Sequence, residues 1–505
     1  MSDVPQRLGV VGAGTMGAGI AQLAAQAGIE TWLHDPVADA LEKGEAYVRK
    51  YAEDAADAHL HTTAELSGLA ECELVIEAAP ERVDLKRDLF AELSEACGPD
   101  TVLATNTSSI LVTSLATAAA RPENVVGMHF FNPPPLMKLL EVIAAETTGE
   151  HALSVARATG EAMGKQVIVA ADGPGFLVNR CGRPFAGEAL RLLQEGVATH
   201  EQIDRIARMA GGFRMGPFEL MDLVGIDVGF EVAKSFDDQS FGEPRWKPSP
   251  LQARKVAAET LGRKSGSGWY EYPGGGEPYR PDDPEPDAPG DGNGRVIAID
   301  GAGPVADALR ERAVGAGFDV RSPEELGGEQ PELIVDAAVP APFSDLGAAE
   351  GGPPTVAICA DRSLAERGDP VACGFHALPP LGALVELTRL PTTPDRVADA
   401  AEGFFRTIGL HPEWVGDAPG LVLGRIVCQL VNEAAFAVGE GAGGPDEVDA
   451  GLRLGLNHPR GPVEWSGLIG ADHVLAALDG LHDDLREPRY RAAPLLRRRR
   501  WPPPT

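Results

Sequence analysis

The sequence predicts an α/β fold with added helical domains: a doubly wound parallel sheet followed by an all-α domain, with the whole unit repeated in degenerate form. Three observations support this prediction. Short apolar runs alternate with helical patterns over the first third of the chain, as in a parallel sheet. Strand signals then almost vanish beyond Asn179. Finally, two stretches of the chain repeat each other at a fixed distance of 245 residues, which indicates an internal duplication.

The bulk properties limit the classes of protein to which the chain can belong. With 505 residues it is too long for one ordinary core, so three or four domains are expected. Its net charge of −31 argues against nucleic acid or an anionic membrane as a partner, because both would repel an acidic surface. The six cysteines show no C-x-x-C pair, so neither a disulfide framework nor a metal site is expected. The apolar run near the N-terminus is too short for a signal peptide or a membrane span, which predicts a cytoplasmic protein.

The first sheet is predicted from its strands in chain order. Leu8–Val11 is an apolar run that leads into glycines and an alanine-rich helical stretch, and Gly28 stops that helix. Thr31–Asp35 has the character of the second strand. The later predicted strands are Leu74–Ala79, Thr101–Thr105, Val125–Phe130 and Leu139–Ile143.

A mainly helical segment follows, since Glu188–Gln194 and Glu201–Met209 have helical spacing. A stretch rich in Pro, Gly and acid then predicts a flexible linker, and at Arg295 the strand and helix pattern restarts. The predicted domains are a Rossmann-type dinucleotide-binding domain at 5–176, a helical domain at 177–271, the linker at 272–294, a degenerate sheet domain at 295–421 and a second helical domain at 422–501.

A comparison of the two copies distinguishes residues that maintain the fold from residues of a functional site, because the second copy keeps the packing motifs and loses polar groups. Asp172–Phe176 aligns with Asp417–Leu421 without a gap, and Glu487–Arg491 echoes Glu243–Lys247. The fixed offset equates three polar residues of the first copy with residues of the second: His129 with Gly374, Asn179 with Gly424 and Glu141 with Glu386. The first copy is therefore interpreted as an active enzyme and the second as its inactive duplicate.

The loop after the first strand has the G-x-G-x-x-G pattern of a Rossmann-type dinucleotide site. Its glycines allow a tight turn and close approach to a pyrophosphate at the helix N-terminus. Asp35 would bind the ribose hydroxyls and repel a 2′-phosphate, so NAD is preferred over NADP, with FAD as the main rival. The expected cofactor-binding residues here are Gly12, Gly14, Thr15, Met16, Gly17 and Asp35.

The corresponding loop of the second copy lacks these features. Ala306 replaces Gly17, Pro304 follows the second glycine, and no acid clearly takes the place of Asp35. We therefore expect the second copy to bind no nucleotide.

A histidine and a glutamate are predicted to form a catalytic pair. The strands that carry His129 and Glu141 are joined through Asn132–Pro135, and a hairpin centred there puts the two residues opposite each other. A carboxylate that holds one imidazole nitrogen fixes the tautomer and leaves the other nitrogen to take a proton. Oxidation of an alcohol by hydride transfer needs such a base, because the hydroxyl proton must leave as the hydride does.

Two further polar segments are expected to face the ligand. Asn106–Ser109 follows a strand at the edge where a parallel sheet presents its binding loops. Asn179 follows the turn Gly173–Phe176 at the start of the helical domain, which makes it a candidate to face the same cleft.

Together these residues resemble the L-3-hydroxyacyl-CoA dehydrogenase family. The resemblance covers residues 5 to about 272 closely and the rest of the chain as a degenerate repeat. The motifs that carry it are Gly12–Gly17, Asn106–Ser109, His129–Pro133, Pro174–Arg180, Met215–Leu220 and Leu261–Gly266.

The resemblance implies an activity and a role for each candidate residue. The reaction would be the reversible oxidation of a 3-hydroxyacyl-CoA by NAD, with acyl-CoA as the substrate. Relatives with two helical domains at this length resemble 3-hydroxybutyryl-CoA and 3-hydroxyadipyl-CoA dehydrogenases. The implied roles are a dyad of His129 and Glu141, orientation of the substrate's 3-oxygen by Ser108 and Asn179, and cofactor contacts by Glu81, Lys86 and Asn106.

One segment departs from the family pattern. Between Asp35 and Glu81 the family usually carries a longer helical hairpin that helps to hold CoA, whereas the segment Leu41–Glu73 is short. A dehydrogenase of a non-CoA hydroxy acid therefore remains an alternative, and an inactive NAD-binding scaffold is the alternative outside enzymes. The duplication also predicts that the two helical domains pack together, as an intramolecular pseudo-dimer or as part of a homodimer.

Overall fold

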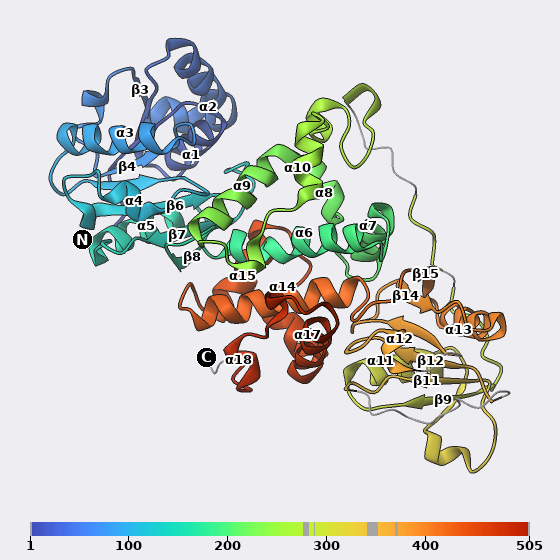
Figure 1. Cartoon of the computed structure of the whole chain (residues 1–505). Helices are drawn as coiled ribbons and strands as arrows, with labels where there is room; N and C mark the ends of the chain where they lie inside the picture. Colours follow the sequence, from blue (N-terminus) through green and yellow to red (C-terminus); the bar gives the residue numbers. More distant parts are fainter. Residues whose placement is uncertain (1–2, 276–281, 287, 341–351, 369–371, 503–505) are drawn as a thin grey trace. The chain divides into compact units, whose positions relative to one another are not determined.

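The computed structural model describes residues 3–275, 282–286, 288–340, 352–368 and 372–502. The chain forms two compact units, each with segments from distant parts of the sequence (Figure 1). The first unit consists of Met1–Arg180 and Glu440–Leu456, and the second of Cys181–Gly439 and Asn457–Thr505. The domain boundaries drawn from the sequence stay a prediction.

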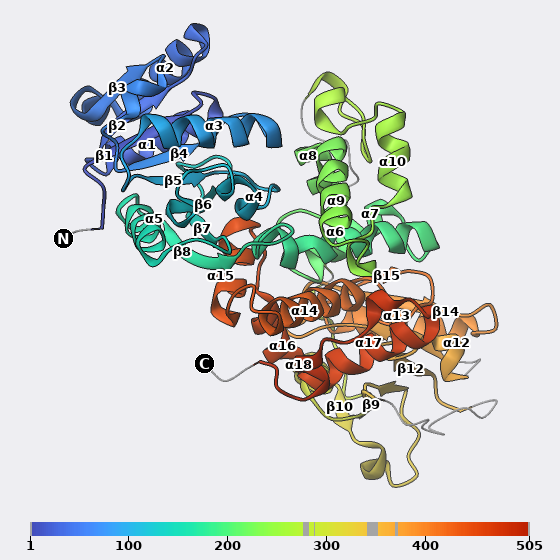
Figure 2. The ribbon, with the colours of Figure 1, turned by 60° about the vertical axis from the view of Figure 1, so that its left-hand side comes forward.

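The first unit is built on a sheet of eight strands, all within the described residues, in the order β3-β2-β1-β4-β5-β6-β7-β8 (Figure 2). Neighbouring strands are parallel except β6 and β7, which form an antiparallel hairpin. The strands are β1 (Arg7–Val11), β2 (Glu30–His34), β3 (Leu60–Thr63), β4 (Leu74–Glu77), β5 (Val102–Thr105), β6 (Val125–Phe130), β7 (Leu139–Ala144) and β8 (Gln166–Ala171).

Successive strand residues point to opposite faces of this sheet. Helices cover both faces. Val10 and Ile76 pack into a core shared with three helices, whereas Val11 and Val75 pack into a second core shared with two others. The sheet is therefore doubly wound, as predicted. The helices of the first core are α1 (Thr15–Gln26), α2 (Ala38–His59) and α5 (Glu150–Ala162), and those of the second are α3 (Val83–Ala96) and α4 (Val112–Ala116).

The segment after the first sheet is helical, as its spacing predicts. Thr199 caps α7 through a reciprocal pair of hydrogen bonds with Gln202. Asp222 accepts hydrogen bonds from the backbone N–H groups of Trp269 and Tyr270, which fastens the end of the first copy to its helices. The helices are α6 (Val178–Glu195), α7 (His200–Met209), α8 (Pro217–Val224), α9 (Ile226–Gln239) and α10 (Pro250–Ala257).

Part of the predicted linker, residues 276–281 and 287, lies outside the described residues. Within the described part, Asp283 forms an ion pair with Arg208 of α7, with an O–N distance of 2.5 Å. This contact ties one point of the predicted linker to the first helical domain.

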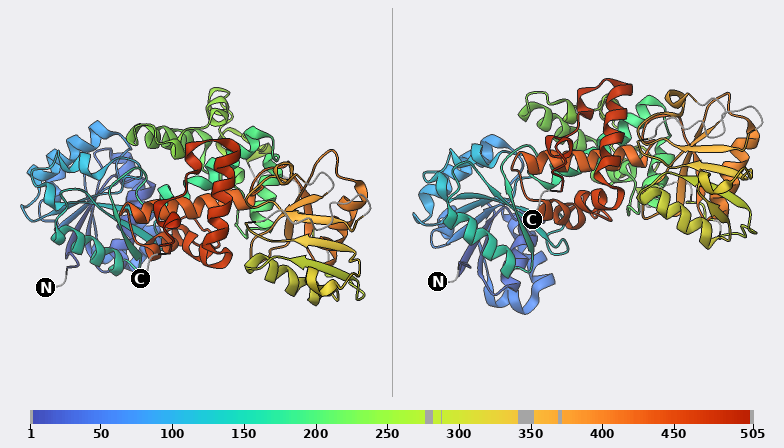
Figure 3. Two further views of the ribbon diagram at one scale, coloured as in Figure 1. Left: turned by 60° about the horizontal axis from the view of Figure 1, so that its bottom comes forward. Right: turned by 90° about the horizontal axis from the view of Figure 1, so that it is seen from below.

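A second sheet of seven described strands lies in the second unit (yellow to orange in Figure 3). Its order, β10-β9-β11-β12-β13-β14-β15, repeats the first sheet without a counterpart of β3. Its strands are β9 (Val296–Asp300), β10 (Asp319–Arg321), β11 (Leu333–Asp336), β12 (Thr355–Ile358), β13 (Cys373–His376), β14 (Leu384–Arg389) and β15 (His411–Trp414). Its helices are α11 (Pro304–Gly315), α12 (Leu364–Arg367) and α13 (Asp395–Thr407).

The second helical segment is divided between the units. One helix, α15 (Pro445–Gly455), belongs to the first unit, where a Cβ on Gly455 would lie 2.9 Å from Leu139 of β7. Nearby, the backbone N–H of Ala171 donates to the carbonyl of Ala442. The remaining helices belong to the second unit and are α14 (Leu423–Gly439), α16 (Pro462–Ile469), α17 (Ala471–Leu485) and α18 (Pro494–Arg497).

Within the second unit, the helical segments of the two copies pack together through reciprocal ion pairs. Arg489 of the second copy binds Glu188 of the first, and Arg245 of the first binds Glu433 of the second at 2.8 Å. The repeat relates the two pairs, at an offset of 245 residues for the glutamates and 244 for the arginines. Each copy therefore supplies the arginine to one pair and the glutamate to the other, as in a two-fold interface. Arg425 adds a buried contact to Glu188 at 2.9 Å.

Candidate active site

The loop after β1 is shaped for close approach to a ligand. Gly12 has a left-handed φ of 102°, and a Cβ there would lie 2.7 Å from the carbonyl oxygen of Ala78. A Cβ on Gly17 would lie 1.8 Å from the carbonyl oxygen of Gly12, so the third glycine lets α1 approach the loop. A Cβ on Gly14 would meet nothing within 4 Å, which leaves open space where a pyrophosphate would lie. Thr15 and Met16 are the first residues of α1, whose N-terminus favours anions.

Asp35 lies directly after β2 and beside the glycine loop. One of its carboxylate oxygens accepts a hydrogen bond of 2.9 Å from the backbone N–H of Ala13, and the other accepts one from Val37. Each oxygen keeps a further lone pair for a ribose hydroxyl. The residues present therefore fit the adenosine half of NAD.

A buried charge cluster lies at the carboxyl ends of β4 and β5. The ammonium of Lys86 is 2.7 Å from the carboxylate of Glu77 and 3.2 Å from that of Glu81, and the lysine side chain is 1% exposed. Glu81 also accepts hydrogen bonds from the hydroxyls of Thr107 and Ser109. Lys86 and Glu81 were predicted cofactor contacts, and the structure brings them together.

The charge of Lys86 helps to lower the pKa of Glu81. Burial alone would raise the pKa of Glu81, but the Lys86 charge and the hydrogen bonds from Thr107 and Ser109 outweigh it and lower the pKa. Sequence reasoning missed Glu77, which is fully buried. The sequence signal for Glu77 was an acidic residue at the end of an apolar strand, since a buried carboxylate needs a cationic partner.

The loop after β5 connects this cluster to the histidine strand. The side-chain oxygen of Asn106 accepts a hydrogen bond of 2.8 Å from the backbone N–H of Phe130, next to His129. The backbone N–H of Ser108 donates to Glu81 at 3.1 Å. The Ser108 hydroxyl forms no hydrogen bond among the described residues and is half-buried, so it is available to a ligand.

His129 and Glu141 form the predicted pair. The strand register places them opposite each other in β6 and β7, with 2.9 Å between His129 Nδ1 and Glu141 Oε2. Because a carboxylate only accepts, Nδ1–H donates, and in the neutral imidazole Nε2 is then the acceptor nitrogen. Glu141 is fully buried, and its other oxygen accepts the backbone N–H groups of Leu177 and Val178 at 2.8 and 3.0 Å. The glutamate therefore joins the histidine to the first turn of α6.

Aromatic rings restrict the histidine from two sides. The ring centroids of Phe131 and Phe176 lie 4.6 and 5.8 Å from that of His129. Phe176 has a left-handed φ of 51°, which costs about 1–3 kcal/mol for a residue with a side chain. This turn presents the two N–H groups to Glu141, and it leads directly to Asn179.

Asn179 is the second residue of α6 and is half-buried. Its side chain has no hydrogen bond within the described part of the chain. The structure thus brings His129, Glu141 and Asn106 together through hydrogen bonds, connects Glu81, Lys86 and Ser108 as a neighbouring group, and attaches Asn179 through the backbone of the Glu141 turn.

The second copy corrects one equivalence drawn from the sequence. His376, and not Gly374, lies opposite Glu386 in the strand register, so equating His129 with Gly374 was wrong. The hairpin is shorter in the second copy, because Glu386 follows His376 by ten residues whereas Glu141 follows His129 by twelve. A fixed offset therefore fails across the hairpin.

The second pair has lost its hydrogen bond. The two oxygens of Glu386 each accept one backbone N–H, from Val422 at 2.6 Å and Leu423 at 3.0 Å, and neither ring nitrogen of His376 has a partner among the described residues. The ring lies where a side chain on Gly424 would be, since a Cβ there would be 2.5 Å from His376 Nε2. Burial lowers the pKa of His376 to about 3 and raises the pKa of Glu386 to about 8. Both groups are therefore neutral at pH 7.

Two classes of site find no support in the described residues. No group of three or more His, Cys, Asp or Glu residues there could hold a metal ion. Within the same residues, no helix combines the length and apolar character needed to cross a membrane.

A dinucleotide loop on a doubly wound sheet, beside a histidine held by a buried carboxylate, defines an NAD-dependent dehydrogenase that oxidises an alcohol. The family model for the 3-hydroxyacyl-CoA dehydrogenase NAD binding domain matches residues 7–173. The model for the C-terminal domain of 3-hydroxyacyl-CoA dehydrogenase matches twice, at residues 175–272 and 420–500. The chain belongs to the 3-hydroxyacyl-CoA dehydrogenase family, and its cofactor is NAD.

Individual relatives agree with the family, and two of those described here cover nearly the whole chain. The 3-hydroxyadipyl-CoA dehydrogenase of Escherichia coli strain K12 is 33% identical, over 98% of this chain and 97% of that protein. A probable 3-hydroxybutyryl-CoA dehydrogenase of Deinococcus radiodurans is 40% identical over 53% of this chain and 100% of its own length. A solved structure of a 3-hydroxybutyryl-CoA dehydrogenase from Escherichia coli K12 matches with a TM-score of 0.80 and 31% identity, over 98% of both chains.

Proposed function

We propose that this chain catalyses the reversible NAD-dependent oxidation of a short-chain (S)-3-hydroxyacyl-CoA to the 3-oxoacyl-CoA, with an acyl group of the 3-hydroxybutyryl or 3-hydroxyadipyl type. The relatives that carry these substrate names support this range. The observation that carries the proposal is the contact of 2.9 Å between His129 and a glutamate fixed by two backbone N–H groups.

The proposed mechanism gives His129 the role of general base. Its Nε2 takes the proton of the substrate's 3-hydroxyl, and Glu141 stabilises the imidazolium that forms. NAD, when bound, accepts the hydride. Ser108 and Asn179 donate hydrogen bonds to the 3-oxygen, consistent with their unpaired side chains, and hold it near Nε2.

The remaining residues hold the cofactor in this proposal. Gly12, Gly14 and Gly17 shape the loop, with Thr15 and Met16 beside the pyrophosphate at the start of α1. Asp35 binds the ribose hydroxyls and disfavours NADP. The neighbouring cluster of Glu81, Lys86 and Asn106 lies toward the nicotinamide ribose.

We also propose that the duplication replaces a dimer interface within one cytoplasmic chain. The reciprocal pairs of Arg489 with Glu188 and Arg245 with Glu433 support this proposal, because a two-fold interface repeats each contact. A second chain is then not needed to cover the helical surface.

The test of substrate class is oxidation of NADH with acetoacetyl-CoA, with 3-oxoadipyl-CoA and with free acetoacetate. Turnover of either thioester, and not of acetoacetate, is the expected result. A comparison of kcat/KM between the two thioesters assigns the acyl group. Turnover of free acetoacetate alone would contradict the acyl-CoA assignment and favour a non-CoA hydroxy acid.

A further inference from the structure

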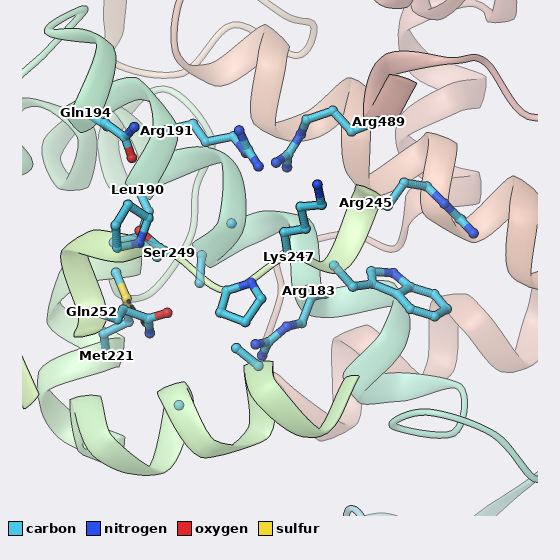
Figure 4. Close-up of a pocket in the computed structure, with 17 residues that line it drawn as sticks. Arg183, Leu190, Arg191, Gln194, Met221, Arg245, Lys247, Ser249, Gln252 and Arg489 are labelled. Carbon is cyan, nitrogen blue, oxygen red and sulfur yellow. Dashed lines mark hydrogen bonds between the residues drawn. The ribbon is translucent and has the colours of Figure 1, made fainter. Parts of the chain in front are cut away.

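A small basic pocket lies in the second unit. None of its lining residues is among those assigned to the dehydrogenase reaction. It is formed by α6, α9, the start of α10 and the two turns η3 (Pro244–Trp246) and η7 (Pro488–Tyr490) (Figure 4). Its volume is about 170 Å³. The turns η3 and η7 are the two copies of the repeated Pro-Arg-aromatic motif, and each contributes its arginine to the wall.

The charge of this pocket is opposite to that of the chain. The chain carries 75 acidic and 44 basic residues, yet the lining contains basic residues and no acidic one. The basic side chains are Arg183, Arg191, Arg245, Lys247 and Arg489. Such a concentration raises the local electrostatic potential and favours an anion.

Three of these cations converge on one point. Figure 4 shows the nitrogen ends of Arg191, Lys247 and Arg489 turned toward one another. Like charges repel strongly where water is partly excluded, so this arrangement requires negative charge nearby. Arg191 has Glu487 at 3.1 Å and Arg489 has Glu188, which offsets two of the three charges.

Donors remain unused after these ion pairs are counted. The side chain of Arg489 is only 5% exposed. Its Nε and Nη1 have no hydrogen-bond partner in the described structure, and Nε lies 4.0 Å from the carboxylate of Glu487. Lys247 and Arg183 form no ion pair with any described residue. Arg183 lies over the ring of Phe236 at 5.0 Å, and burial lowers its pKa to about 10. A buried donor without a partner is unusual in a native protein and indicates that a ligand completes it.

The duplication shows that the scaffold does not require two of these charges. At the repeat offset of 245 residues, Arg183 corresponds to Cys428 and Arg191 to Phe436. The same helix position is therefore compatible with uncharged residues in the second copy. Arg183 and Arg191 therefore have no basic counterpart in the second copy, whereas Arg245 and Arg489 are the arginines of the ion pairs between the copies.

We propose that this pocket binds an oxyanion, a phosphate or carboxylate group at the end of a small molecule. Guanidinium groups match the paired oxygens of both anions, and an ammonium adds a point charge. The volume of about 170 Å³ admits such a group and excludes a whole nucleotide. The bound oxyanion is either part of a small free molecule or a phosphate group of CoA. In the second case the rest of CoA lies outside the pocket.

The test is calorimetric titration of the full chain in a chloride buffer of low ionic strength, with inorganic phosphate, adipate and CoA as ligands. Phosphate or adipate is expected to bind, and Lys247→Gln and Arg183→Gln should each weaken binding about tenfold, as expected for loss of a charge-assisted hydrogen bond. Lys234→Gln is the matched control, since this lysine of α9 pairs with Glu231 outside the pocket. Unchanged NADH affinity and circular dichroism show that the variants are folded.

The outcomes separate the two sources of the anion. If CoA competes with phosphate and is weakened by the same two variants, the pocket takes a CoA phosphate. If only the free anions bind there, the pocket takes a small phosphate or carboxylate compound. The proposal is wrong if none of the three ligands binds, or if Lys234→Gln weakens binding as much as the pocket variants do. Binding is measured without turnover, so a failed substrate assignment and a failed anion site are distinguishable.

Discussion

At the scale of single residues, Glu141 and Glu386 occupy the same strand position and differ in what they hold. Both accept N–H groups from the turn that starts the following helix, but only Glu141 keeps one oxygen for a histidine. The shared role explains why the glutamate is present in both copies. The sequence predicted the pair of His129 and Glu141 because a hairpin register follows from strand spacing. It could not predict the broken pair of the second copy, which depends on the rotation of one carboxylate.

Replacement of Glu141 by Gln tests the glutamate's part in proton transfer. The amide cannot stabilise an imidazolium, and with its oxygen accepting from Leu177 and Val178 its NH₂ group faces His129 Nδ1, so kcat with acetoacetyl-CoA should fall about 10²-fold or more. The affinity for NADH, measured by fluorescence titration, should stay within about twofold. The matched control is Glu386→Gln, which resembles the protonated acid and should leave kcat unchanged. Equal losses in both variants would mean that the glutamate acts only on the fold.

The stability of the second copy should depend on pH through His376. Its folded pKa of about 3 lies below the ordinary value of 6.5, so the unfolded chain binds the proton more readily. The contribution of His376 to stability should be constant above pH 6.5 and become more unfavourable as the pH drops from 6.5 toward 3. Replacement by Leu removes this loss. On going from pH 7.5 to pH 5, the free energy of unfolding of His376→Leu should therefore rise by about 2 kcal/mol relative to that of the parent. Thermal melting at both pH values measures this difference. An equal change in melting temperature for the two proteins would contradict the role given to His376.

At the scale of elements, the sequence predicted those strands and helices whose pattern is local. The buried strands β1, β4, β5, β6 and β7 are continuous apolar runs, and each was predicted. The edge strands β3 and β8 were not, because an edge strand is partly exposed and its sequence is less apolar. The sequence also could not show that α15 joins the first unit, because this depends on tertiary packing and not on the helical period.

The contact between the helical segments should depend on Arg425. Its buried guanidinium binds Glu188 and Glu195, so Arg425→Met leaves Glu195 without this cation and Glu188 with Arg489 alone. The substitution should destabilise the protein by about 3–5 kcal/mol. Thermal unfolding checks this effect. Arg460→Met serves as the comparison, since Arg460 is partly exposed and its pair with Glu464 is long, at 3.7 Å. A similar melting temperature for both variants would show that the interface does not depend on the buried pair.

At the scale of the whole molecule, we propose that the duplication gives one chain the parts of a dimer. The first copy carries the site residues, and the second contributes helical surface and α15. If this division is right, residues 1–275 alone should expose the apolar helix surface and dimerise or aggregate, whereas the full chain does not need a partner. Light scattering measures the mass of each. A monomeric fragment with full activity would count against the pseudo-dimer.

The central claim is that a single histidine, held by Glu141, transfers the proton while the neighbouring loop holds NAD. The most direct measurement is turnover of acetoacetyl-CoA and NADH by His129→Gln, with NADH affinity measured on the same sample. The account predicts a loss of turnover of about 10²-fold or more, with NADH bound as in the parent protein. A variant that binds NADH and keeps most of its turnover would contradict the account, because another group would then be the base.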